Sequence, residues 1–368
     1  MRTLAWCSRP RTSAALLDGA LTIEQHFGES APLSIGVEEE VMLLDAETFA
    51  PVPAVRQLLA DADGRELPGR LKTELHASVV ELNTDVCGSV QEAVEALATL
   101  RATAAELLER RGLRLAAAGS HPFAEPEELE VVDEKRYREF VGYAGVTARR
   151  QAVNGLHVHV GMPGPEECVA TLETILPWMP LVLALSANSP YLAARATGLA
   201  SNRAEVLAQL PRSGAPPIFS SYSEWERWVE AFVATGLASG YTQLWWDVRP
   251  HPTFGTLEIR VPDQPTALPL TAAFLALLRD LCAWALEHPA AGPADRGIYQ
   301  QNRWAASRFG PEAQLIHDGR VLRATELVAE LPVEAADLDP TTCEAAQQLA
   351  AGDPRAACAD IVQRTWPS

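Results

Sequence analysis

The sequence has few cysteines, a shortage of positive charge and no long hydrophobic run, and each shortage excludes a class of protein. Its six cysteines are scattered without C-x-x-C spacing, which excludes a disulfide scaffold and a thiolate metal site. Lys and Arg number 30 against 48 Asp and Glu, so a net charge of -18 repels nucleic acid and anionic membranes. No uncharged apolar run reaches the roughly 18 residues that span a bilayer, and residues 1–30 lack the apolar stretch of a secretory signal. We therefore expect a cytoplasmic protein with no nucleic-acid or membrane partner.

The composition is that of a folded chain with a large core. The 368 residues are 48% hydrophobic and 21% charged. We find neither an internal repeat nor a low-complexity linker that would divide the chain. The first residues show no sustained periodicity. We predict an N-terminal extension at residues 1–32, partly helical at most, and a single domain at residues 33–368.

Caps and apolar periodicity predict several helices. Ser89 and Glu92 have capping-box spacing, and Gly112 stands where that helix would end. Ser223 and Glu226 predict the start of another helix. Segments 169–187 and 270–287 are apolar on nearly all sides, which is typical of buried helices. The last 50 residues are alanine-rich and helical in character, and loops are expected at 211–217, 250–255 and 262–265.

Four segments alternate with the period of a β-strand, and each has one apolar face. They are 34–44, 79–84, 156–161 and 256–261. Strands and helices do not alternate steadily along the chain, as they would in a parallel barrel or a doubly wound sheet. The order favours an α+β fold in which helices pack on the apolar face of an antiparallel sheet.

The opposite faces of these strands carry charged and imidazole groups. The residues that share this face are Glu38, Glu40, Glu81, His157, His159, Glu258 and Arg260. Glu74 precedes Glu81 by seven residues, so it joins the same face only if the chain bends between them. Glu39 has the apolar parity, which places it at a sheet edge or behind the others rather than among them.

Such a face requires a counter-ion. Two carboxylates about 4 Å apart repel by roughly 4 kcal/mol at an effective dielectric near 20. A solvated face would mix lysine with glutamate to limit this repulsion, and all four segments omit lysine. A lone E-x-E or H-x-H is usually only an exposed strand, but the combination predicts a divalent metal site. Oxygen donors with one imidazole favour Mg²⁺ or Mn²⁺ over zinc.

Six motifs occur in order along the chain and together resemble a known family. They are Gly36-Val37-Glu38-Glu39-Glu40, Glu74 with Val79-Val80-Glu81-Leu82-Asn83-Thr84, Asn154-Gly155-Leu156-His157-Val158-His159-Val160-Gly161, Leu185-Ser186-Ala187-Asn188-Ser189-Pro190, Leu244-Trp245-Trp246-Asp247-Val248-Arg249-Pro250 and Gly255-Thr256-Leu257-Glu258-Ile259-Arg260. Over residues 33–368 the chain resembles the type 2 glutamate-cysteine ligases, also called YbdK-like carboxylate-amine ligases. The strand pattern is also similar to that of glutamine synthetase.

The resemblance implies a glutamine synthetase-like catalytic domain whose antiparallel sheet holds ATP and two or three Mg²⁺ or Mn²⁺ ions. The implied reaction has two steps. A carboxylate, usually the side-chain carboxylate of glutamate, attacks the γ-phosphate of ATP and forms an acyl phosphate. An amine, from cysteine or another amino compound, then displaces phosphate. Small amino-acid substrates and a homodimer are expected on the same grounds.

The resemblance also implies roles for individual residues. Glu38, Glu258 and His157 would bind one metal ion, and Glu40, Glu74 and Glu81 another ion nearer the substrate. His159 would contact a phosphate oxygen, and Arg203 and Arg249 would bind phosphate or the substrate carboxylate. Arg260 and Glu81 are the candidate catalytic residues, because the Arg260 fork can bind a developing oxyanion. Segment 75–78 lacks the basic residue that relatives often have there.

Two other functions fit parts of the pattern. Amidohydrolase barrels also combine H-x-H with distant carboxylates, so a metal-dependent hydrolase is the alternative enzyme, although such barrels carry H-x-H on their first strand. An inactive binding protein on the same scaffold is the other alternative, against which the full set of charged residues argues. Trp245 and Trp246 are expected in the core or stacked on adenine, and Cys87 is expected to pack at a turn.

Overall fold

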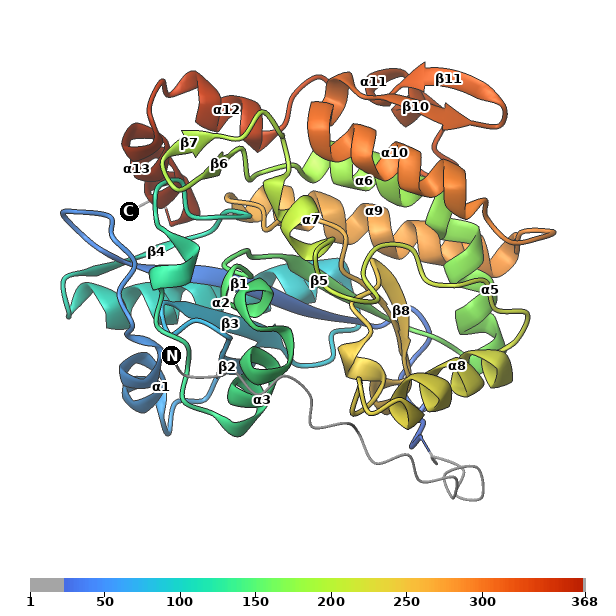
Figure 1. The fold of residues 1–368 in the computed structure, drawn as a ribbon, viewed down its shortest axis with the longest axis horizontal. Coiled ribbons are helices and arrows are strands. Elements are labelled where there is room, and N and C mark those ends of the chain that lie inside the picture. Colours follow the sequence, from blue (N-terminus) through green and yellow to red (C-terminus); the bar gives the residue numbers. More distant parts are fainter. Residues whose placement is uncertain (1–22, 367–368) are drawn as a thin grey trace, which may run out of the picture.

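A central antiparallel sheet organises the computed structural model, which describes residues 23–366 (Figure 1). Its seven strands follow the order β2-β3-β1-β5-β9-β8, and β4 pairs with the last residues of β1 on the side of β5, beyond the first residue of β5. The strands are β1 Ile35–Asp45, β2 Gly69–Thr73, β3 Val79–Thr84, β4 Leu113–Ala116, β5 Leu156–Gly161, β8 Val248–His251 and β9 Thr256–Ile259. Two small hairpins are β6 Tyr191–Leu192 with β7 Arg195–Ala196, and β10 Gln314–His317 with β11 Arg320–Arg323. The predicted α+β class and all four predicted strands are confirmed.

Helices surround this sheet on both sides. The α-helices are α1 Val55–Ala62, α2 Val90–Glu109, α3 Lys135–Ala144, α4 Val146–Arg149, α5 Pro165–Ile175, α6 Met179–Ser186, α7 Asn202–Leu207, α8 Tyr222–Ala234, α9 Leu268–Glu287, α10 Arg296–Phe309, α11 Ala324–Leu327, α12 Glu344–Ala350 and α13 Pro354–Thr365. The 3₁₀ turns are η1 Pro126–Glu128, η2 Leu176–Trp178, η3 Tyr241–Gln243, η4 Pro252–Phe254, η5 Gly310–Glu312 and η6 Val328–Glu330.

The apolar face of the sheet and the helices α2, α5 and α9 form the main core. Val37, Val158 and Ile259 are at most 1% exposed and belong to the same cluster as Leu97 of α2 and Leu278 of α9. Complete burial of such side chains contributes about 1.5–3 kcal/mol each. On the other face, apolar packing occurs where β1 meets β4. There Met42 and Leu44 pack against Ile361 of α13. The remainder of that face, which carries the charged residues, is left for the site.

The apolar helices belong to this core. By length and composition alone, Pro165–Ser186 and Leu268–Glu287 could each cross a membrane. In the structure 89% and 50% of their most apolar windows are buried inside the protein, so packing against the sheet accounts for their hydrophobicity. The prediction of buried helices at 169–187 and 270–287 is confirmed, with η2 interrupting the first of them at its prolines.

The N-cap residue predicted from the sequence is confirmed for α2 and is wrong for α8. Ser89 accepts a hydrogen bond from the Glu92 amide at 3.1 Å at the start of α2, as predicted, and Gly112 adopts φ 70° after its end. Helix α8 begins two residues earlier than predicted, because Ser221 accepts from the Glu224 amide. The chain there contains two overlapping Ser-x-x-Glu spacings, and the sequence alone does not distinguish them.

Two segments differ from the predicted secondary structure. Part of the expected loop 250–255 is strand β8, which contains Pro250. This strand stands at the edge of the sheet, where a residue without an amide hydrogen is tolerated. Within the alanine-rich C-terminal segment, residues 320–323 form strand β11 rather than helix. Of the predicted extension, residues 1–22 lie outside the described residues. Residues 23–32 contact the domain, for example through the Gly28 amide and the Met162 carbonyl at 3.1 Å.

A buried ion pair joins the sheet to α2 directly beneath the charged face. Glu39 and Arg101 are both fully buried, and their two hydrogen bonds measure 2.7 and 2.6 Å. Glu39 also accepts from Gln264 at 3.0 Å and from Thr271 at 2.9 Å. Because β1 lies in the middle of the sheet, Glu39 occupies the interior behind the charged residues, which is the second of the two expected positions and not a sheet edge. The sheet therefore separates this carboxylate from Glu38 and Glu40.

We expect Arg101→Met to destabilise the fold by about 3–5 kcal/mol, because it leaves the Glu39 charge buried without a partner. Urea unfolding followed by circular dichroism measures this difference. Arg111→Met is the matched control, since the Arg111 pair with Asp61 is partly exposed and should contribute at most about 1 kcal/mol. Equal costs in the two variants would contradict a structural role for the buried pair.

Candidate active site

Antiparallel register brings the charged side chains of four strands together. Glu38 of β1 stands opposite His157 of β5 and opposite Asn83 of β3. Glu40 stands opposite Glu81, and Glu258 stands opposite His159. Directly opposed residues have Cβ atoms about 4.5–5.5 Å apart, so like charges at such positions repel. These pairings place residues from distant parts of the chain on one wall.

The wall contains two clusters that could each hold a metal ion. Cluster A consists of Glu38, His159 and Glu258, and cluster B consists of Glu40, Glu74 and Glu81. In each cluster one potential ligand atom per residue lies within 4.8 Å of the others. Glu74 directly follows β2, and the connection from β2 to β3 provides the bend that its participation required. All the carboxylates of the predicted metal site are thus brought together.

Cluster A is stabilised by neighbouring positive charge. Burial disfavours ionisation of Glu258, yet the guanidinium groups of Arg249 and Arg260 hold its pKa well below the usual value. Burial opposes ionisation of Glu38 too, and a hydrogen bond with His157 together with the nearby His159 imidazole keeps its pKa low. The Nε2 atom of His159 is buried without a hydrogen-bond partner and lies 3.7 Å from Glu38 Oε1. An unpaired imidazole nitrogen beside two ionised carboxylates fits a metal ligand.

Cluster B is compensated less, because Arg203, Arg260 and Arg136 lie near it without forming an ion pair with its carboxyl groups. Burial and the neighbouring Glu74 raise the pKa of Glu40 to about 8. Burial raises the pKa of Glu74, and burial together with Glu38 and Glu74 raises that of Glu81 well above its usual value. Lys72 approaches Glu81 only to 3.7 Å. Three buried carboxyl groups this close need either protons or a cation, and an all-oxygen set fits Mg²⁺ or Mn²⁺.

The two histidines are grouped differently from the sequence expectation. His159, predicted to contact phosphate, completes cluster A, where His157 was expected. His157 lies between the clusters, with Nδ1 3.1 Å from Glu38 and Nε2 4.0 Å from Glu40. Burial and Arg260 lower the pKa of His157 to about 4, so its imidazole is neutral. The difference arises from strand register, because only pairing with β9 reveals that His159 faces Glu258.

The three arginines are not equivalent. Arg249 is buried and directs Nε and Nη2 at Glu258, while its Nη1 donates to the carbonyls of Thr242 and Leu244. With these donors engaged, Arg249 positions Glu258 and has little left for a phosphate. Arg203 donates to the carbonyls of Val261 and Arg260 at 3.1 and 2.9 Å. Arg260 bonds to Glu258 and also lines an open pocket.

Arg203 reaches this place because Gly155 has no side chain. A Cβ atom on Gly155 would lie 2.1 Å from Nη2 of Arg203. The Gly155 amide in turn donates to Glu40 at 2.6 Å. This glycine of the Asn154-Gly155-Leu156-His157 motif therefore serves close packing around cluster B.

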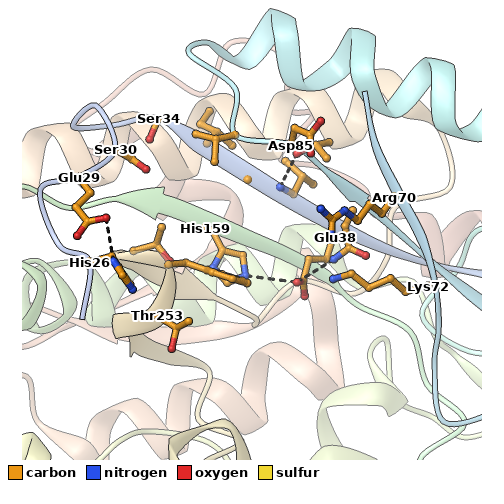
Figure 2. Close-up of a pocket in the computed structure, with 18 residues that line it drawn as sticks. His26, Glu29, Ser30, Ser34, Glu38, Arg70, Lys72, Asp85, His159 and Thr253 are labelled. Atoms are coloured by element: carbon orange, nitrogen blue, oxygen red, sulfur yellow. Dashed lines mark hydrogen bonds and ion pairs between the residues drawn. The ribbon is translucent and has the colours of Figure 1, made fainter. Parts of the chain in front are cut away.

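A cavity of about 530 Å³ opens beside cluster A (Figure 2). Figure 2 shows Arg70 and Lys72 of β2 pointing toward Glu38, with His26 and Glu29 on the opposite side of the opening. Sequence reasoning missed the two cations. Their alternation in Gly69-Arg70-Leu71-Lys72-Thr73 is a signal that could have found them. Lysine is thus absent from the four predicted strands but present on the neighbouring one.

A second cavity, of about 350 Å³, opens beside cluster B. Its ionic part is formed by Glu40, Glu74, His157, Arg203 and Arg260. Its apolar part includes Phe140 and Trp245. Trp246 is only 2% exposed and packs with Phe219, so of the two tryptophans Trp246 is in the core and Trp245 lines the second cavity. Cys87 packs against Ile35 at the end of β1, as expected.

Comparisons with known proteins agree with this architecture. A glutamate-cysteine ligase from Francisella tularensis, solved in complex with AMP, superposes with a TM-score of 0.63 at 14% identity, covering 91% of this chain and 89% of that one. A bifunctional glutathione synthetase from Pasteurella multocida has a TM-score of 0.60 at 15% identity, covering 91% of this chain and 51% of that one. At such low identity these structures establish the fold alone.

Sequence relatives establish the family. A Rubrobacter xylanophilus protein provisionally named glutamate–cysteine ligase 2-3 is 45% identical over 293 residues, which is 80% of each chain. A Sorangium cellulosum protein provisionally named glutamate–cysteine ligase 2 is 37% identical over 310 residues, covering 83% of this chain and 80% of that one. Residues 34–356 match the sequence profile of glutamate-cysteine ligase family 2. The chain belongs to this family and is a carbon–nitrogen ligase.

Proposed function

We propose that the protein is an ATP-dependent ligase that joins the γ-carboxylate of glutamate to the amine of cysteine or another amino compound, with release of ADP and phosphate. The observation that carries the proposal is the pair of cavities on either side of one wall of acidic and imidazole groups. Family membership and the names of the relatives support the reaction class.

The first cavity suits the nucleotide. Arg70 and Lys72 provide positive charge for phosphates, and Glu38 and His159 close the inner end at cluster A. The second cavity suits the amino-acid substrates, because Arg203 and Arg260 can bind carboxylates there. Arg260 bonds to Glu258 and lines the second cavity, so it stands where the two substrates would meet.

Clusters A and B would hold divalent ions, Mg²⁺ or Mn²⁺, and two or three ions are expected in all. Bound there, such ions supply charge neutralisation for phosphates and carboxylates. The protein supplies the ligand set and its orientation. Arg249 fixes the Glu258 carboxylate through its Nε and Nη2 atoms, and the Gly155 amide fixes Glu40.

The chemistry then follows from positioning. An oxygen of the donor carboxylate attacks the γ-phosphorus, the bond to the ADP oxygen breaks, and ADP leaves as an acyl phosphate forms. The amine nitrogen next attacks the acyl carbon, the bond to phosphate breaks, and the amine loses a proton. Arg260 binds the oxyanions that develop. His157 lies between the clusters and is neutral, so each of its ring nitrogens can take part in one hydrogen bond, one as a donor and the other as an acceptor. Glu81 acts through cluster B, since it lies beside Glu40 and Glu74.

The alternative of an amidohydrolase-type hydrolase loses its support. Its barrel would need parallel strands, and the sheet is antiparallel. A homodimer and a cytoplasmic location stay predictions.

Glu38→Gln should lower glutamate- and amine-dependent ADP release by about 100-fold or more, because it removes a charge from cluster A without stranding a buried arginine. A coupled assay for ADP measures the loss, and thermal unfolding verifies the fold. Glu66→Gln, an exposed carboxylate that lines neither cavity, is the control and should stay near normal. Near-normal ADP release by the Glu38 variant would refute the role of cluster A.

Arg260→Lys should reduce kcat by about 10²–10³-fold and raise the KM for ATP much less, because a point charge does not reproduce bidentate contact with a developing oxyanion. Steady-state kinetics with ATP varied at saturating glutamate separate the two parameters. A KM increase as large as the kcat loss would instead identify Arg260 as a residue that binds the ground state.

Without metal, stability should fall as pH rises above about 6.5. The pKa values of Glu40, Glu74 and Glu81 are raised in the folded state, so their protonated forms stabilise the fold below about pH 4.5. This contribution is lost as pH rises through the folded pKa, about 8 for Glu40. Below about pH 6.5 the buried histidines with lowered pKa values, His76, His121, His157 and His251, change stability in the opposite direction. In EDTA the melting temperature should therefore decline between about pH 6.5 and 8, and Mn²⁺ should restore it at pH 8 by about 5 °C.

Glu74→Gln tests whether cluster B causes this behaviour. It should flatten the decline of the melting temperature with pH in EDTA and weaken the rescue by Mn²⁺. Glu139→Gln, an exposed carboxylate at the second cavity, should leave both unchanged. Equal melting temperatures with EDTA and with Mn²⁺ at pH 8 in the unsubstituted protein would contradict a cation site at cluster B.

A further inference from the structure

The second cavity has an apolar wall that the proposed chemistry does not require. Leu207 and Leu210 come from α7 and its end, Phe140 comes from α3, and Trp245 precedes β8. The same cavity is lined by Glu40 and Glu74 of cluster B and by Arg260, and Arg136 and Glu139 line it from the same helix as Phe140. Phosphoryl transfer and amide formation involve charged and polar atoms, so an apolar wall indicates an apolar part of a ligand.

Trp245 is turned toward the cavity by the alternation of its strand-like backbone. Its neighbours Leu244 and Trp246 are 1% and 2% exposed and belong to one core cluster with Val169 and Trp225. Trp245 is partly exposed and lines the cavity instead. The two tryptophans therefore have separate roles, and that of Trp245 is not core packing.

The Trp245 ring is held in place before any ligand arrives. The Phe140 ring lies 5.4 Å away at an interplanar angle of 44°, and the Arg212 guanidinium lies 5.6 Å from the Trp245 ring. Arg212 is itself fixed by hydrogen bonds to the carbonyls of Leu237 and Gln243 at 3.1 and 3.4 Å. A ring fixed in this way loses little conformational entropy when it contacts a ligand.

We propose that the acceptor substrate of this ligase is a primary amine with an aryl or bulky apolar side chain, which packs against Trp245 and Phe140. This inference rests on the proposed function and specifies its second substrate. The –CH₂SH group of cysteine is too small to cover the wall, whereas an aromatic ring buries about 150–250 Å² in such contacts. The amine nitrogen then lies toward the ionic part of the cavity, where it displaces phosphate from the acyl carbon.

The experiment compares amines of increasing apolar size in the full chain with ATP, Mg²⁺ and glutamate. The panel contains L-alanine, L-cysteine, L-phenylalanine and phenethylamine, and kcat/KM is measured from phosphate release with product masses confirmed. We expect the best aryl amine to exceed alanine and cysteine by about tenfold or more. Phenethylamine and L-phenylalanine together distinguish a simple amine from an amino acid.

Hydroxylamine serves as an acceptor that is independent of side-chain size. It traps the acyl phosphate as a γ-glutamyl hydroxamate with release of phosphate, so it reports the first step alone. Hydroxamate formation without any preference for aryl amines would overturn this inference and leave the proposed function standing. Failure to form hydroxamate from glutamate and ATP would overturn the proposed function and this inference with it.

Variants at Trp245 link the preference to the wall. Trp245→Ala should reduce kcat/KM for aryl amines about tenfold or more, chiefly through KM, and change hydroxamate and alanine rates less than about twofold. Trp245→Phe should retain most of the preference. Trp228→Ala is the matched control, because Trp228 is 38% exposed on α8 and lies outside the cavity lining. Equal losses for all acceptors in Trp245→Ala would overturn the assignment.

Discussion

The repulsion between carboxylates on one wall of the sheet is the constraint on which the site depends. Glu40 and Glu81 are directly opposed across two strands, and Glu74 stands beside them without an arginine partner. Ordinary sheets avoid this arrangement, since like charges at opposed positions destabilise the pairing. The fold maintains it because the opposite face is tightly packed against α2 and α9. Packing of the core thus offsets the free energy of folding that is lost through repulsion between the carboxylates.

The two clusters meet this constraint in different ways. Cluster A is adjacent to Arg249 and Arg260, which keep Glu258 ionised, and it faces the larger cavity. Cluster B has raised pKa values and faces the smaller cavity. A permanently ionised cluster beside a cavity with cations suits a polyanionic ligand, because the ligand brings its own counter-ions. Cluster B, whose three carboxyl groups have raised pKa values, is the cluster that we propose stands beside the amine substrate.

Much of the site could be predicted from sequence because strand parity is simple. Glu38, Glu40, Glu81 and Glu258 were found by period-two alternation, and all four lie on the expected face. The residues that face each other across the sheet depend on strand register, and alternation carries no information about register. The sequence therefore predicts His157 in cluster A and His159 at a phosphate, whereas His159 belongs to cluster A and His157 lies between the clusters. The role of Arg249 could not be predicted for the same reason, because only the pairing of β8 with β9 at the sheet edge shows that Arg249 donates to Glu258. The apolar wall of the second cavity was not predicted from the sequence for another reason. Its members come from three elements with no shared motif.

The segment before β1 has a consequence for where the functional unit begins. His26, Glu29 and Ser30 line the larger cavity, and the His26 amide donates to the Pro252 carbonyl at 2.9 Å. A chain shortened to start at Leu33 would keep every residue of both clusters and still lose one side of that opening. Such a truncated protein would lack residues that line one end of the cavity that we propose for the nucleotide, and that end would be more open to bulk water. Boundaries drawn from motif matches alone would therefore cut away part of the enclosure, which is contributed by residues that carry no recognisable motif.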